Sequence, residues 1–252
     1  MSVIEKIFQF LLLFYLSLQA NLAFASEGNN KIDSLYKAKK ILSKIHIENP
    51  ITFYCKCKYN TKKPNLESCG FIPKKDFKRS SRIEWEHILP ASYFGKEFDE
   101  WKYGHNKCVT QKGRKFKGRK CAKKISKQYR KMQADLYNLQ PAIGEVNKLR
   151  RNYQIGIING EIREFGLCDI EIRNKKIEPA PEIRGDVART YMYMEQSYPN
   201  YIQFESSIRK LIITWDKNDP VDYWECKRAK EISKIQGNSN HIINKRCNKK
   251  FW

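Results

Sequence analysis

Eight cysteines constrain this chain more than any other feature of its sequence. All eight follow the apolar N-terminal stretch, and they are Cys55, Cys57, Cys69, Cys108, Cys121, Cys168, Cys226 and Cys247. An even number of cysteines in an exported chain predicts disulfides, although the sequence does not choose among the 105 ways of pairing eight. Zinc binding is disfavoured, because the chain has a C-x-C but no pair of C-x-x-C knuckles. We therefore expect a compact fold cross-linked by disulfides.

The N-terminus predicts that the chain is exported. Residues 7–18 read IFQFLLLFYLSL behind Lys6, and Ala23-Phe24-Ala25 forms a small-x-small cleavage pattern before Ser26. This is typical of a secretory signal peptide, since the apolar run is shorter than the roughly 20 residues of a membrane span. We expect a signal peptide over 1–25 and one domain over 26–252, located in the periplasm or secreted. An uncleaved anchor is the alternative.

Hydrophobic periodicity predicts a mixed α+β domain. Helical spacing covers 31–47, 122–135, 142–149, 185–198, 203–216 and 222–235. Short strands are expected at 52–55, 82–89 and 155–175, the last with a hairpin turn at Asn159-Gly160. Residues 95–120 are expected to form a loop. Because strands and helices do not alternate regularly, a single α+β domain fits better than a parallel α/β sheet.

The charge of the chain predicts a polyanionic partner. The formal net charge is +22, and residues 102–131 contain 13 Lys or Arg and no acidic residue. The phosphate backbone of nucleic acid matches such a segment. A solvated basic surface or a contact with an anionic membrane are the alternatives.

The segment RIEWEHILPA, residues 82–91, places Glu86 directly before His87 at the end of an apolar strand. Asn138 and Asn147 lie further along the chain. They are nine residues apart, and a proline and the start of a predicted helix lie between them. One carboxylate and one amide oxygen suit Mg²⁺, which retains several waters. A neutral histidine can take a proton from an attacking water, as phosphodiester hydrolysis requires. The other interpretation is that each of these residues is an ordinary packed, turn or capping residue.

Several longer motifs make the chain resemble the bacterial endonuclease I family of periplasmic and secreted nonspecific nucleases. The resemblance covers about residues 35–250. The motifs are FYCKC (53–57), PNLESCG (64–70), SRIEWEHILPA (81–91), GRKC (118–121), DLYNLQPAIGEVN (135–147), ARTYMYM (188–194), VDYWEC (221–226) and KIQGN (234–238).

The resemblance implies a ββα-metal, or His-Me finger, active site. It implies that Glu86 and Asn147 hold one Mg²⁺, with Mn²⁺ as an alternative, that His87 is the general base, and that Asn138 orients the site. A catalytic arginine belongs in the G-R-K segment, where Arg119 matches better than Arg114 because of its offset from Cys121. The segment is longer and more basic here than in shorter members of the family, which leaves the choice between the two arginines open.

The resemblance further implies an enzyme that hydrolyses double- and single-stranded DNA, and RNA, without sequence preference to 5′-phosphate products. We expect a monomer, because nothing in the sequence demands a partner chain. No contact with a membrane is expected after the signal peptide is removed. Arg114, Lys117 and Arg150 are expected to contact nucleic acid. A cationic protein that binds nucleic acid without cleaving it, and one that acts on membranes or acidic polymers, remain the competing hypotheses.

Overall fold

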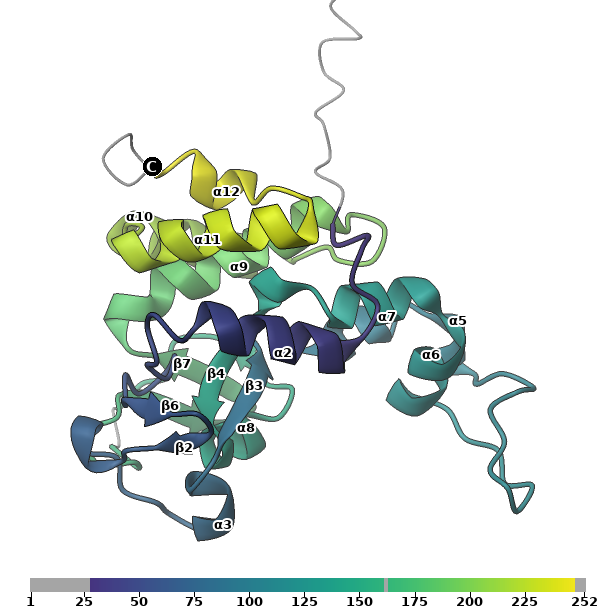
Figure 1. Ribbon diagram of the computed structural model, residues 1–252, viewed down its shortest axis with the longest axis horizontal. Helices are drawn as coiled ribbons and strands as arrows, with labels where there is room; N and C mark the ends of the chain where they lie inside the picture. Colours follow the sequence, from purple (N-terminus) through teal and green to yellow (C-terminus); the bar gives the residue numbers. More distant parts are fainter. Residues whose placement is uncertain (1–27, 161–162, 248–252) are drawn as a thin grey trace, which may run out of the picture.

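The computed structural model describes residues 28–160 and 163–247. The predicted signal peptide lies outside the described residues. Helices and short strands build one domain of the α+β class, as the sequence predicted (Figure 1). Within the described ranges no helix is long and apolar enough to cross a membrane.

Two antiparallel strands and a helix form the centre of the domain. Strand β3 (Ile83–His87) pairs with β4 (Leu139–Ile143), so that Glu86 lies opposite Gln140 and His87 opposite Leu139. Helix α8 (Gly144–Arg150) begins directly after β4. Pro141 lies within β4 without interrupting it, and its carbonyl accepts a hydrogen bond from the Phe53 N–H at 2.7 Å. The ladder thus brings residues 83–87 beside a segment more than 50 positions later in the chain.

Helices cover this centre. Figure 1 shows α2 (Leu35–Ile45) running across the strands, with α9 (Arg184–Ser197), α10 (Ser206–Asn218), α11 (Tyr223–Gln236) and α12 (His241–Asn244) gathered above it. The predicted helices at 31–47, 185–198, 203–216 and 222–235 are confirmed within a few residues. Arg189 is fully buried between α9 and α11, where Glu225 accepts hydrogen bonds from its Nε at 2.7 Å and its Nη2 at 2.6 Å. Such a paired charge ties the two helices together.

The segment between β3 and β4 carries most of the basic run. Its elements are α4 (Ala91–Gly95), α5 (Asp99–Lys102), α6 (Arg119–Ile125), α7 (Lys127–Gln133) and the 3₁₀ turn η2 (Leu136–Asn138). The single helix predicted over 122–135 is therefore wrong. Ser126 is extended, and its hydroxyl accepts a hydrogen bond from the Tyr129 N–H at 3.0 Å, which ends one helix and begins the next.

Two short strands were also predicted at the wrong place. Residues 52–55 form a turn, in which the Lys56 N–H donates to the Thr52 carbonyl at 3.0 Å. The expected hairpin at Asn159-Gly160 is replaced by one at Asn174-Lys175, two residues with positive φ that join β6 (Ile170–Arg173) to β7 (Lys176–Pro179). The remaining short elements are β1 (Tyr59–Asn60), β2 (Lys63–Pro64), η1 (Glu67–Cys69), α3 (Phe77–Ser80), β5 (Gln154–Ile155) and η3 (Pro181–Ile183).

All eight cysteines are paired, which confirms the predicted disulfides. The bonds are Cys55–Cys168, Cys57–Cys69, Cys108–Cys121 and Cys226–Cys247. Three of them close loops of 12 to 21 residues, and Cys55–Cys168 joins positions 113 apart. Cys108–Cys121 fixes the start of α6 to the basic segment, so the disulfide pattern bears directly on the position of Arg119.

Candidate active site

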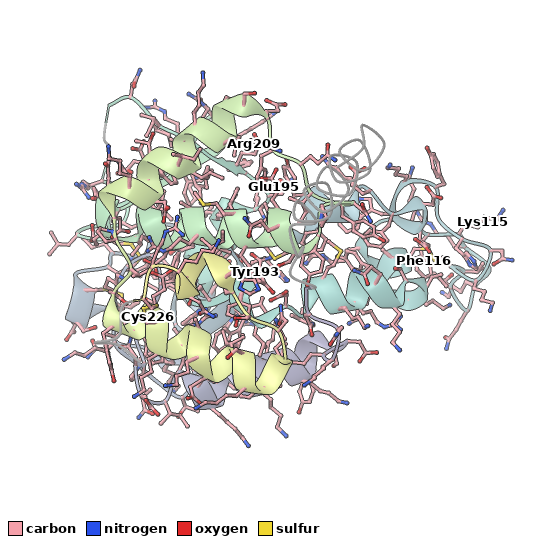
Figure 2. All side chains as sticks on the ribbon, turned by 90° about the horizontal axis from the view of Figure 1, so that it is seen from above. Lys115, Phe116, Tyr193, Glu195, Arg209 and Cys226 are labelled. Atoms are coloured by element: carbon pink, nitrogen blue, oxygen red, sulfur yellow. A yellow bond between two sulfur atoms is a disulfide. The ribbon has the colours of Figure 1, made fainter. Side chains whose placement is uncertain are left out.

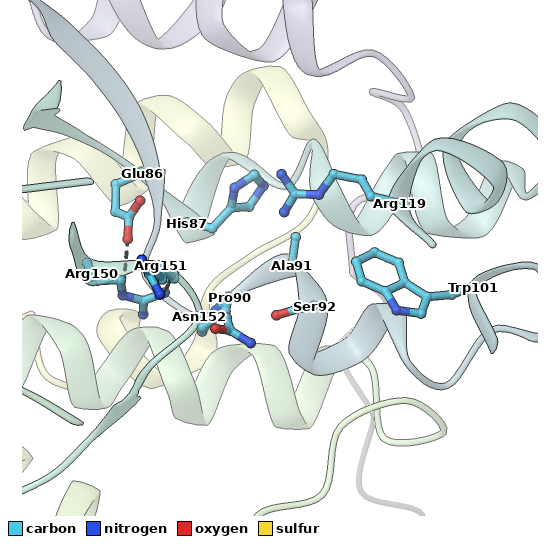
Figure 3. Close-up of a pocket in the computed structure, with 10 residues that line it drawn as sticks. All are labelled: Glu86, His87, Pro90, Ala91, Ser92, Trp101, Arg119, Arg150, Arg151 and Asn152. Atoms are coloured by element: carbon cyan, nitrogen blue, oxygen red, sulfur yellow. Dashed lines mark hydrogen bonds and ion pairs between the residues drawn. The ribbon is translucent and has the colours of Figure 1, made fainter. Parts of the chain in front are cut away.

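A pocket of about 320 Å³ opens at the C-terminal end of β3 (Figure 3). Residues from three segments line it: Glu86 and His87 from β3, Trp101 and Arg119 from the segment between the strands, and Arg150 from the end of α8. Figure 3 shows the His87 ring and the Arg119 guanidinium pointing toward one another. The structure therefore brings the Glu86-His87 pair together with the arginine preferred from the sequence.

His87 is held as a neutral imidazole. Its Nε2 lies 2.9 Å from the carbonyl oxygen of Gln133, which can only accept a hydrogen bond, so Nε2 carries the hydrogen and Nδ1 keeps a lone pair. Burial, together with the positive charge of Arg119, lowers the pKa of His87 to about 3. The ring is thus an unprotonated base across the whole neutral range.

Glu86 is a buried carboxylate whose hydrogen-bonding capacity is only partly used. Its side chain is 4% exposed, and burial raises its pKa to about 7 against the opposing charge of Arg150. Its Oε1 lies 3.1 Å from Arg150 Nε, but among the described residues this oxygen accepts no hydrogen bond of good geometry. A buried carboxylate with free acceptor capacity is suited to a cation.

Asn147 faces the same side of β3 as Glu86, but no hydrogen bond joins the two. Its Nδ2 donates to Glu84 Oε2 at 3.1 Å, and Glu84 shares a strand face with Glu86 because side chains alternate along a strand. A carboxylate can only accept hydrogen bonds, so it must face the NH₂ group of the Asn147 amide and not the amide oxygen. The amide oxygen is consequently the atom left to contact a ligand.

Glu84 itself is held by cations. Arg79 forms a salt bridge with it and donates from Nε at 3.0 Å, and Arg82 donates from Nε at 2.8 Å. These partners hold the Glu84 carboxylate in place beside α8.

Gly144 allows α8 to approach this strand. A Cβ at Gly144 would lie 2.6 Å from the Arg79 carbonyl oxygen and 3.0 Å from the Glu84 carboxylate. We predict that Gly144→Ala lowers the free energy of unfolding by about 1–3 kcal/mol, because the backbone must move. Chemical denaturation measures this effect.

Gly156→Ala is the matched control for that prediction. Its Cβ would meet only the side chain of Lys176, 2.8 Å away, which can turn aside. Equal losses of stability in the two variants would show that the approach of α8 to Glu84 has no special role.

Asn138 fixes the backbone that follows His87. Its fully buried side chain accepts a hydrogen bond from the Leu89 N–H at 2.7 Å and donates to the Leu89 carbonyl at 3.0 Å. Its own carbonyl accepts from the Ile88 N–H at 3.0 Å. Asn138 therefore holds the turn out of β3, and among the described residues its side chain forms hydrogen bonds with the Leu89 backbone and not with the His87 ring.

The four basic residues predicted from the sequence lie in different environments. Arg119 is exposed and lines the pocket, whereas Arg114 lies on the exposed basic segment outside it. Lys117 is exposed and lines a neighbouring groove. Arg150 differs from a simple surface contact: it is 1% exposed and donates to the Ile88 carbonyl while pairing with Glu86.

Comparison with known proteins decides the family. The family model of Endonuclease I matches residues 20–247. The chain belongs to the endonuclease I family. It is 43% identical to Endonuclease-1 of Buchnera aphidicola subsp. Acyrthosiphon pisum (strain APS) over 225 residues, which is 87% of this chain and 84% of the relative. It is also 39% identical to an extracellular deoxyribonuclease of Aeromonas hydrophila (90% of this chain, 95% of the relative) and 40% identical to a periplasmic deoxyribonuclease of the same species (83% and 84%).

Membership of the endonuclease I family confirms that the chain is an endonuclease. The predicted periplasmic or secreted location is likewise confirmed, since relatives are named extracellular and periplasmic enzymes. Nucleases of this family typically use a divalent metal ion. In the part of the chain that the structure describes, no cluster of three or more His, Cys, Asp or Glu side chains forms a metal site. A site built from one carboxylate and one amide would have a different composition.

Reasoning from the sequence missed three residues of this candidate site. Glu84 could have been found, because its spacing of two from Glu86 places both on one strand face. Trp101 directly precedes the basic segment and carries no local signal. Gln133 acts through its main-chain carbonyl, which no side-chain pattern can reveal.

Proposed function

We propose that this protein is an exported, Mg²⁺-dependent, nonspecific endonuclease that hydrolyses DNA and RNA to 5′-phosphate products. In this proposal β3, β4 and α8 form a ββα-metal, or His-Me finger, site. The observation that carries it is the neutral His87, fixed by the Gln133 carbonyl, next to a buried Glu86 whose Oε1 forms an ion pair with Arg150 but accepts no hydrogen bond of good geometry. The names of the relatives support DNA as a substrate, and a monomer is the expected working form.

Glu86 and Asn147 are the residues that would hold the ion. They offer a carboxylate and an amide oxygen, which suit Mg²⁺ or Mn²⁺ better than a soft metal. When bound, the ion would supply charge stabilisation at the scissile phosphate and its leaving oxygen. Arg150 would balance part of the Glu86 charge when the ion is absent.

His87 would act as the general base. Its Nδ1 lone pair accepts a proton from water as the water oxygen bonds to phosphorus, and the bond from phosphorus to the 3′-oxygen breaks. The 3′-oxygen leaves as an alkoxide and takes a proton from water, and the phosphate stays on the 5′-oxygen of the following nucleotide. The hydrogen bond from Nε2 to Gln133 keeps the ring in the tautomer that this step requires.

Arg119 would stabilise the phosphate as negative charge develops. We predict that Arg119→Ala lowers kcat for plasmid cleavage by about 10²-fold, whereas Arg114→Ala changes it less than threefold, because Arg114 does not line the pocket. Both substitutions remove one positive charge from the same segment, so they affect long-range attraction of DNA equally. A larger loss in Arg114→Ala would assign the catalytic arginine to position 114.

Digestion of supercoiled plasmid by the oxidised mature protein, with Mg²⁺ and with a chelator, tests the proposal. Nicking that requires the metal supports it, and labelled RNA in the same assay tests the wider substrate range. If the protein binds plasmid but leaves it intact with several divalent ions, the alternative of a nucleic-acid-binding protein without catalysis replaces it.

A further inference from the structure

A second hollow lies on the basic arm. We define the basic arm as residues 103–117, which project from the body of the domain between α5 and α6 (Figure 1). The hollow has a volume of about 520 Å³ and is lined by the two sides of the arm, Tyr103 to Asn106 and Lys115 to Lys117. Figure 2 shows Lys115 and Phe116 on this projection, far from the C-terminal helices.

The basic arm is a hairpin whose two sides are held together by backbone hydrogen bonds and a disulfide. Phe116 N–H donates to the Cys108 carbonyl at 2.9 Å, and Thr110 N–H donates to the Arg114 carbonyl at 2.9 Å. The Cys108–Cys121 disulfide closes its base, and Gly118 N–H donates to the Trp101 carbonyl at 3.1 Å. The two sides of the hollow are therefore held at a defined separation.

The linings of the hollow and of the active pocket are close together along the chain. Trp101 and Arg119 line the pocket, while Tyr103 and Lys117 line the hollow, so two residues separate the two linings on each of two segments. Two residues span at most about 7 Å of backbone. A strand cleaved in the pocket would thus reach the hollow within a few nucleotides.

The side chains of the hollow suit an unstacked nucleotide. Tyr103 is 80% exposed and offers an aromatic face, and Lys115 and Lys117 offer positive charge on the other side. The basic arm contains five Lys or Arg and no acidic residue. An aromatic platform beside cations is the arrangement that binds single-stranded nucleic acid, in which bases are free to stack on side chains.

We infer that the hollow between Tyr103 and Lys117 is a base-stacking subsite for a single-stranded segment beside the scissile phosphate. This inference rests on the proposed function and adds a preference for unpaired nucleic acid. A base inside a duplex has both faces covered and cannot stack on Tyr103. A duplex would therefore be bound only through the charge of the lysines, whereas a single strand would be bound through this charge and through stacking on Tyr103.

Equilibrium binding in the His87→Ala background tests the inference without cleavage. The probes are a fluorescein-labelled single-stranded DNA 12-mer and the duplex of the same sequence, measured by anisotropy with Mg²⁺. Adding Tyr103→Ala should weaken single-strand binding about tenfold and duplex binding less than twofold. Tyr36→Ala, which removes a tyrosine 72% exposed on α2, is the matched control and should change neither.

Salt dependence separates stacking from charge. Tyr103→Ala should leave the slope of log Kd against log salt unchanged, and Lys117→Ala should reduce its magnitude by about 0.7 to 1. Tyr103→Phe should bind single strands like the parent, because the phenyl ring still stacks.

Two results would overturn the inference. One is single-strand binding within twofold of the parent in Tyr103→Ala, and the other is an equal loss for single strand and duplex. Wild-type cleavage of plasmid together with either result would leave the proposed nuclease function intact. Failure of the wild type to cleave any substrate would instead contradict the proposed function, while the binding data would still decide the role of the hollow.

Discussion

Replacing His87 with alanine should lower the rate of plasmid cleavage by about 10²- to 10⁴-fold, the usual contribution of a general base. The ring supplies the only neutral nitrogen base among the described residues that line the pocket, and burial keeps it neutral. DNA binding should change little, because the arginines of the pocket remain. Single-turnover cleavage and anisotropy on the same DNA measure the two effects.

Loss of the ring also leaves the Gln133 carbonyl without its donor, so folding must be controlled. His87→Asn keeps an amide donor but no base, and it should be as inactive as the alanine variant at higher stability. Imidazole added to His87→Ala should restore part of the rate by occupying the space of the lost ring. His241→Ala, at an exposed position on α12, should cleave like the wild type. Cleavage by both His87 variants within fivefold of the wild type would assign the base elsewhere.

The sequence predicted those parts of the fold that depend on local patterns. Apolar periodicity located α2, α9, α10 and α11, and the apolar run around Trp85 located β3. Cysteine number and export predicted disulfides, but pairing depends on distances in the folded chain, and Cys55 meets a partner 113 positions away. The split between α6 and α7 was missed because Ser126 resembles a tolerable helical residue until its side chain is seen to cap the next helix.

For the candidate site, too, the sequence predicted the residues themselves but not the contacts between them. Glu86, His87, Asn138 and Asn147 were chosen from residue type and from resemblance, and the structure places all four around the β3–β4–α8 unit. The residues that contact these four side chains could not be predicted from the sequence, because each contact joins positions far apart in the chain. Arg150 illustrates this: a basic residue near a nucleic-acid site suggests a surface contact, yet here its guanidinium is the buried counter-ion of Glu86.

The second large effect concerns pH. At low Mg²⁺ concentration, activity should fall about fivefold between pH 7 and pH 6 and about 50-fold between pH 7 and pH 5. Glu86 must be ionised to hold a cation, and burial raises its pKa to about 7 in the metal-free protein. Protons therefore compete with the metal as the pH falls. His87, with its pKa lowered to about 3, stays neutral over this range and contributes nothing to the loss.

Competition between protons and the metal for Glu86 makes the pH dependence of activity change with Mg²⁺ concentration. Titration of the general base His87 would not have this effect. Raising the Mg²⁺ concentration should move the midpoint of the acid limb to lower pH, because binding of the ion favours ionised Glu86. Calorimetric titration of the metal should show proton release on binding near pH 7 and little at pH 9. Glu86→Gln, which keeps the shape but cannot ionise, should be poorly active at every pH and show no metal-dependent midpoint. A midpoint that stays in place over a 100-fold range of Mg²⁺ would mean that another group, and not Glu86, governs activity in acid.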